Sequence, residues 1–180
     1  SWEYLTEEEW VKSAALIFRG TVQDKKELLI EEVVSDEYTS KSYASVFSFK
    51  ISELYYSDDS QVRVGDIVKI LSGTTSYNWE EEAIRIEEGK EFIIFAGMLE
   101  DYTKATKYTR LAKYGLGNPW APIIQIKGGS YVIDSIFESL GNNASLSERK
   151  ISDNYYKDVF ISSDENFISD LMELIRKYKN

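Results

Sequence analysis

The clearest strand signal lies in residues 43–56, which read YASVFSFKISELYY. Phe47, Phe49 and Ile51 recur at every second position, with more polar residues between them. Alternation with a period of two is typical of a strand that has one face in a core and the other toward solvent. This stretch therefore predicts a half-buried strand and indicates a fold that is mainly β.

Other β-like runs lie on both sides of this stretch. We expect strands at 15–22, 28–34, 67–70, 83–86, 92–95, 123–126 and 131–133. The last two runs flank Lys127-Gly128-Gly129-Ser130, and adjacent glycines permit the positive φ angles that a tight two-residue turn requires. The sequence therefore predicts a β-hairpin at residues 123–133.

Both ends of the chain carry helix signals. Thr6 and Glu9 have the spacing of a capping box, which predicts a short helix over about 6–14 with Trp10 and Val11 inward. At the C-terminal end, Ser162 and Glu165 are expected to cap a helix over about 163–179. Apolar residues recur there at helix spacing, namely Phe167, Ile168, Leu171, Leu174, Ile175 and Tyr178. Residues 141–162 are polar and are interpreted as a surface connection.

These elements predict one domain, residues 1–180, because single domains commonly run to about 100–200 residues. We expect a mainly β fold, an OB-like antiparallel barrel over about 15–135, with a short N-terminal helix and a C-terminal helix. Closing the strands into a barrel removes the exposed strand edges along which small β domains pair with one another.

Composition excludes several kinds of chemistry. The chain has no cysteine and no histidine, so disulfides, thiolate metal sites and histidine-dependent triads cannot form. We expect a protein that is not an enzyme and holds no cofactor or metal. The alternative is a hydrolase that uses carboxylates on glycans, although 31 acidic residues offer such pairs without any motif.

An acidic segment and a basic segment follow one another. Between Tyr77 and Glu91, the glutamates at 80–82, 87 and 88 indicate either a calcium loop or, as we favour, a solvated loop. Residues 101–127 then carry five basic residues against Asp101 alone, in a chain with a net charge of −10. Cations and aromatic rings together are typical of surfaces that bind a polymer.

The candidate ligand-binding residues come from this basic segment. They are Tyr102, Lys104, Lys107, Tyr108, Arg110, Lys113, Tyr114 and Trp120. We expect a partner that is either a protein or an anionic or glycan polymer. Nucleic acid is disfavoured because the net charge opposes the approach of phosphates. The other interpretation is that these tyrosines cover the barrel while the lysines pair with Glu80–Glu91.

Four pieces of the chain carry a family resemblance. They are residues 14–22, 43–54, 64–70 and 88–95. Together they resemble exported bacterial domains with an OB-like barrel, as in the netrin-like or metalloproteinase-inhibitor-like superfamily. The resemblance implies a barrel and an extracytoplasmic location. Inhibitors of that superfamily chelate the target's metal through an N-terminal cysteine, which this chain lacks, so that mechanism is not carried over.

Three functional hypotheses remain. The first is a non-catalytic extracytoplasmic binding or adaptor domain of the bacterial cell surface. The second is the carboxylate-dependent hydrolase. The third is a structural module that packs on a neighbouring domain through the C-terminal helix. No apolar run reaches the roughly 18–20 residues of a membrane span, and we expect any signal peptide or anchor to lie upstream of Ser1.

Overall fold

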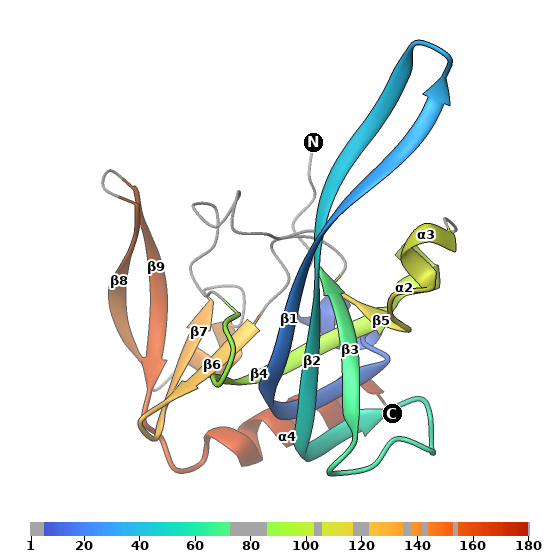
Figure 1. Cartoon of the computed structure of the whole chain (residues 1–180). Coiled ribbons are helices and arrows are strands. Elements are labelled where there is room, and N and C mark those ends of the chain that lie inside the picture. The colour runs from blue at the N-terminus through green and yellow to red at the C-terminus, as the bar shows by residue number, and fades with distance from the viewer. Residues whose placement is uncertain are drawn as a thin grey trace.

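Five strands form a closed ring in the computed structural model (Figure 1). The structure describes residues 6–72, 86–102, 106–116, 123–134, 138–141, 144–152 and 155–179. The ring consists of β1 (Leu16–Ser35), β2 (Tyr38–Ser57), β3 (Ile67–Ser72), β5 (Tyr114–Gly115) and β4 (Glu91–Met98). It closes because β1 pairs with β2 along one edge and with β4 along the other. The predicted mainly β fold with an OB-like barrel and a helix near each end is confirmed.

One pairing in the ring differs from the antiparallel prediction. β3 and β5 run parallel, with Ile70 beside Tyr114 and Leu71 beside Gly115, whereas β5 is antiparallel to β4. The reason is that the connection from β4 returns through two short helices before β5 enters the gap. The segment that was predicted to bind ligand therefore also supplies the strand that closes the barrel.

The rest of the sheet extends from β4 outside the ring. β6 (Ile123–Lys127) pairs with β4, and β7 (Ser130–Asp134) pairs with β6. The predicted hairpin between them is confirmed, with φ angles of 58° at Gly128 and 81° at Gly129. The predicted barrel limits of 15–135 are therefore too wide, because β6 and β7 do not belong to the ring.

The prediction of a surface connection at 141–162 is wrong. This stretch contains β8 (Ser145–Ser152) and β9 (Tyr155–Ser162), an antiparallel pair that joins the sheet through β7. β9 places Val159 in a hydrophobic core, where that side chain is buried.

The helices pack on the outer wall of the barrel. α1 (Glu7–Ser13) has the predicted capping box, and Trp10 and Val11 are buried. α4 (Phe167–Lys179) buries Phe167, Leu171, Leu174 and Ile175. The predicted cap at Ser162 is wrong, since that residue ends β9 and its hydroxyl accepts a hydrogen bond from the amide of Asp164 at 3.3 Å. No helix in the described part of the chain is long and apolar enough to cross a membrane.

Two of the hydrophobic cores lie on opposite faces of the strands. Inside the ring, the Phe49 ring meets those of Phe18 and Phe92 edge to face, at centroid distances of 5.4 and 6.4 Å. Outside it, Ile17 and Ile93 pack with the apolar face of α4. β1 and β4 are therefore apolar on both faces where they belong to the ring, which fixes their position.

β1 and β2 continue well beyond the barrel. Separate strands were expected at 15–22 and 28–34, but β1 is one strand of 20 residues. It pairs with β4 only along 16–21, and β2 pairs with β3 only along 45–50. Residues 26–44, here called the arm, thus form a two-stranded ribbon that projects from the barrel (Figure 1).

Candidate functional site

A groove with a basic lining lies beside β3, where the β4–β5 connection folds over the barrel. The connection contains α2 (Leu99–Tyr102) and α3 (Thr106–Thr109), which lie close to the base of the arm (Figure 1). The groove has a volume of about 350 Å³ and is lined by Lys69, Met98, Leu99, Glu100, Thr109, Arg110, Leu111, Ala112 and Lys113. We call it the basic groove.

Apolar packing holds the basic groove in place. Leu99 and Ala112 are buried against Leu71 of β3 and against Ala44 and Val46 of β2. The amide of Leu99 also donates to the carbonyl of Lys113 at 2.9 Å. The start and the end of the β4–β5 connection are thereby fixed on the barrel. The backbone that carries the cationic side chains of this connection is therefore held at both ends.

The structure brings together only some of the predicted ligand-binding residues. Lys107 and Tyr108 lie on α3, and Arg110 and Lys113 follow it as lining of the basic groove. α2 ends at Tyr102. The remaining predicted residues are Tyr114, which is buried, and Lys104 and Trp120, which lie outside the described residues.

Tyr108 and Tyr114 are packing residues in this structure. The hydroxyl groups of Tyr108 and Ser42 are 2.8 Å apart, which joins α3 to the arm. Tyr114 is 4% exposed within the barrel core, and this burial raises the pKa of its phenol. For these two rings the structure agrees with the interpretation that tyrosines cover the barrel.

The three cations of the basic groove are in different electrostatic states. Lys113 Nζ lies 2.8 Å from a carboxylate oxygen of Asp59, and this hydrogen bond raises the pKa of Lys113 and lowers that of Asp59. Lys69 and Arg110 are exposed, and neither forms an ion pair with a described residue. Two cationic side chains therefore face solvent at the groove.

Lys69 was missed by the sequence analysis. It lies on β3 between Val68 and Ile70, and Ile70 is fully buried while Lys69 is exposed. The alternation of side-chain directions along the strand predicted at 67–70 could have indicated that Lys69 points away from the core. Only the fold shows that this outward side faces the turn after α3.

The described glutamates of the acidic segment form ion pairs or hydrogen bonds with nearby residues. Glu87 pairs with Lys90 at 2.5 Å, and Glu91 pairs with Arg19 at 2.8 Å. Glu88 accepts a hydrogen bond from the amide of Lys25 at 3.2 Å. Glu80, Glu81 and Glu82 lie outside the described residues, and within the described ones no group of three or more acids is arranged to hold a metal ion.

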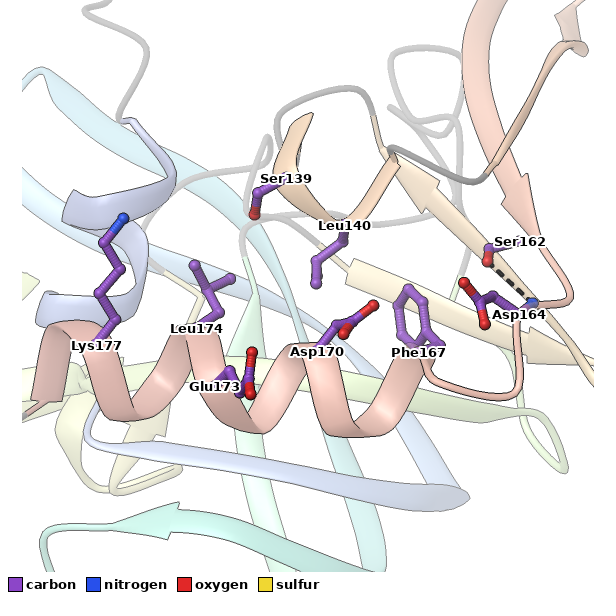
Figure 2. A pocket seen from close by; sticks show the side chains of 9 residues that line it. All are labelled: Ser139, Leu140, Ser162, Asp164, Phe167, Asp170, Glu173, Leu174 and Lys177. Atoms are coloured by element: carbon purple, nitrogen blue, oxygen red, sulfur yellow. Dashed lines mark hydrogen bonds between the residues drawn. The ribbon is translucent and has the colours of Figure 1, made fainter.

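A second groove lies between α4, the end of β9 and the 3₁₀ helix η2 (Glu138–Gly141). Its volume is about 500 Å³, and Figure 2 shows Ser139 and Leu140 across from α4. Its acidic residues are Asp164, Asp170 and Glu173, with Lys177 as the one lining cation. Asp170 and Glu173 are exposed to solvent.

A search with models of known protein families finds no match for this sequence, and a search of curated proteins finds none either.

Proposed function

We propose that this protein is a non-catalytic binding domain of the bacterial cell surface whose basic groove takes an anionic polymer. The observation that supports the proposal is the gathering of Lys69, Arg110 and Lys113 at one groove in a chain with a net charge of −10. Lys69 and Arg110, which form no ion pair with a described residue, mark a local reversal of the field in an acidic protein, and this favours a negatively charged ligand.

The position in the fold supports the same proposal. OB-type barrels bind polymers over their second and third strands and the neighbouring loops. Lys69 lies on the third strand, and Arg110 lies on the connection between β4 and β5. An arginine guanidinium can hold a carboxylate or phosphate group with two parallel hydrogen bonds, while a lysine contributes a point charge.

The two alternatives have weaker support. The hydrolase needs two carboxyls that converge in a cleft, whereas Asp170 and Glu173 of the second groove, between α4 and η2, are exposed to solvent. The structural module needs an apolar helix face for a neighbour, but α4 uses Leu171 and Ile175 to cover this chain's own barrel. A binding role needs neither feature.

The proposal is tested by calorimetric titration with polygalacturonate, a carboxylated glycan, and with neutral dextran as the comparison polymer. We expect polygalacturonate to bind with an affinity that falls as salt rises, and the Lys69→Gln/Arg110→Gln variant to lose at least ten-fold. The matched control is Lys26→Gln/Lys127→Gln, which removes the same charge from exposed positions outside the groove.

Three results would count against the proposal. They are equal binding of dextran, equal losses in the two double variants, and no binding of polygalacturonate or of polyphosphate as a second anionic polymer. The cell-surface location is tested separately by fractionation, and recovery of the protein without an exported precursor would contradict it.

A further inference from the structure

The arm carries a concentration of exposed apolar side chains. They are Leu29, Val33, Val34, Tyr38 and Tyr43, and Val33 is 75% exposed. A contiguous apolar surface on a soluble domain usually marks an interaction site. None of these five side chains lines the basic groove, so this surface needs an explanation of its own.

The pairing register of β1 and β2 places Leu29, Val33 and Tyr43 on one face of the arm, and we call these three residues the apolar strip. Leu29 lies directly opposite Tyr43, and Val33 lies opposite Thr39. Residues directly opposite on an antiparallel pair project from the same face. Between these two pairs, Glu31 lies opposite Lys41, with the charged atoms 3.6 Å apart. One face of the arm thus carries an apolar pair, then a salt bridge, and then Val33 beside Thr39.

The opposite face is already covered at the base of the arm. Leu28 and Ile30 pack in the cluster that contains Ala44, Val46 and Tyr108. Because side chains alternate along a strand, covering Leu28 and Ile30 leaves Leu29 on the other side. The arm is therefore anchored by α3 on one face and open on the other.

An isolated two-stranded ribbon is at best marginally stable in water. The arm has no third strand among the described residues, and its apolar strip is only partly covered in this chain, with Leu29 and Tyr43 about half exposed. Burying apolar surface contributes roughly 25 cal/mol per Å². A partner that covers the strip would supply the stabilisation that the ribbon lacks.

The net charge of the arm indicates which kind of partner can cover its apolar strip. The tip, residues 31–41, has four acidic residues and one basic residue, a net charge of −3. In a tip-to-tip contact, a second copy of the chain would bring a tip with the same net charge of −3, so the two tips would repel each other. An anionic lipid surface would also repel the tip. We propose that the arm docks on another protein whose surface has an apolar centre and a rim of lysine and arginine.

The probe for this proposal is a fluorescent ten-residue peptide of alternating valine and lysine, which presents an apolar face and cations as a strand does. Binding is followed by fluorescence anisotropy on the intact chain. We expect saturable binding that Val33→Ser/Val34→Ser weakens at least ten-fold and that Asp36→Lys/Glu37→Lys also weakens. The control is Val64→Ser/Ile67→Ser, which changes exposed apolar residues at the β2–β3 turn.

Four results would overturn the proposal. If a valine–glutamate peptide binds equally well, the partner needs no positive charge. If an all-lysine peptide binds equally well, the partner needs no apolar surface. A dimer in sedimentation that Val33→Ser/Val34→Ser dissolves makes the occupant a second copy. Binding to phosphatidylglycerol vesicles that is lost in the same variant makes it a membrane.

This proposal does not rest on the proposed ligand of the basic groove. The Lys69→Gln/Arg110→Gln variant should bind the peptide as the parent chain does, and Val33→Ser/Val34→Ser should bind polygalacturonate as the parent does. The two variants therefore show separately whether the arm proposal fails and whether the basic-groove proposal fails.

Discussion

The ammonium group of Lys179, near the end of α4, donates a hydrogen bond to the carbonyl oxygen of Ala14, which caps the end of α1. It also donates to the carbonyl of Lys12 at 2.8 Å and lies 4.4 Å from the ring centroid of Tyr56. One cation thus satisfies carbonyl groups at the end of α1 and joins both ends of the described chain to β2.

Replacing this cation should destabilise the fold. Lys179→Met keeps most of the aliphatic stem but removes charge-assisted hydrogen bonds, so we expect a loss of about 1–3 kcal/mol in the free energy of unfolding. Urea denaturation measures this loss. Lys177→Met is the control, since that side chain is exposed on the same helix. Equal effects of the two changes would show that the Lys179 contacts contribute nothing specific.

The hydrogen bond between Ser42 and Tyr108 should hold the base of the arm. Tyr108→Phe keeps the ring in its apolar cluster and removes only the hydroxyl. We expect a cost of about 1 kcal/mol, visible as faster hydrogen exchange of amides at 28–30 and 42–44. Tyr38→Phe, at the exposed tip, should leave those amides unchanged. Unchanged exchange in Tyr108→Phe would mean that packing alone anchors the arm.

Local patterns in the sequence predicted the elements whose signals are themselves local. The capping box of Thr6 and Glu9 and the glycine pair at 128–129 each act over a few residues, and both are present in the structure. The continuity of β1 was not predictable in this way. Polar residues at 23–27 interrupt the apolar pattern because β1 pairs with β4 only along 16–21, and among the described residues its outer edge has no strand partner beyond that point.

The candidate site was less predictable because its contacts join distant parts of the chain. The alternative interpretation paired the lysines with Glu80–Glu91, but Lys113 pairs with Asp59 on the β2–β3 connection. Nothing in the local sequence separates Tyr114 from the half-buried Tyr108, and only the closure of the ring by β5 buries Tyr114. Such outcomes depend on topology, which a pattern of residue types does not contain.

Gly20 marks a close approach of β1 to β2. A Cβ atom there would lie 2.7 Å from the carbonyl oxygen of Lys50 and 3.0 Å from the Phe18 ring. Gly20→Ala should therefore cost about 1–3 kcal/mol, since backbone must shift to relieve the overlap. At Gly115 the nearest atom, at 2.8 Å, is a methyl group of Leu99, which can turn away. Urea unfolding should rank Gly20→Ala as the more damaging change, and the reverse order would contradict this explanation.

The ion pair between Asp59 and Lys113 should be visible in acid titration. The hydrogen bond from Lys113 lowers the pKa of Asp59 below its usual 3.8, with a smaller effect from the amide of Gln61. Because the folded value is the lower one, the stabilisation is present above pH 3.8 and is lost as the pH falls through the folded pKa. Carbon-13 NMR of the Asp59 carboxyl measures this value directly.

Lys113→Met should raise the pKa of Asp59 toward 3.8, while Lys107→Met, as a charge-matched control on α3, should leave it unchanged. The result bears on the basic groove as well as on stability. A lysine held by Asp59 has part of its charge already neutralised, which leaves Lys69 and Arg110 as the main contacts for an anion. If the Asp59 titration does not respond to Lys113→Met, the pair is absent in solution. Lys113 would then join the other two cations, and Lys113→Gln should weaken polygalacturonate binding as much as Arg110→Gln does.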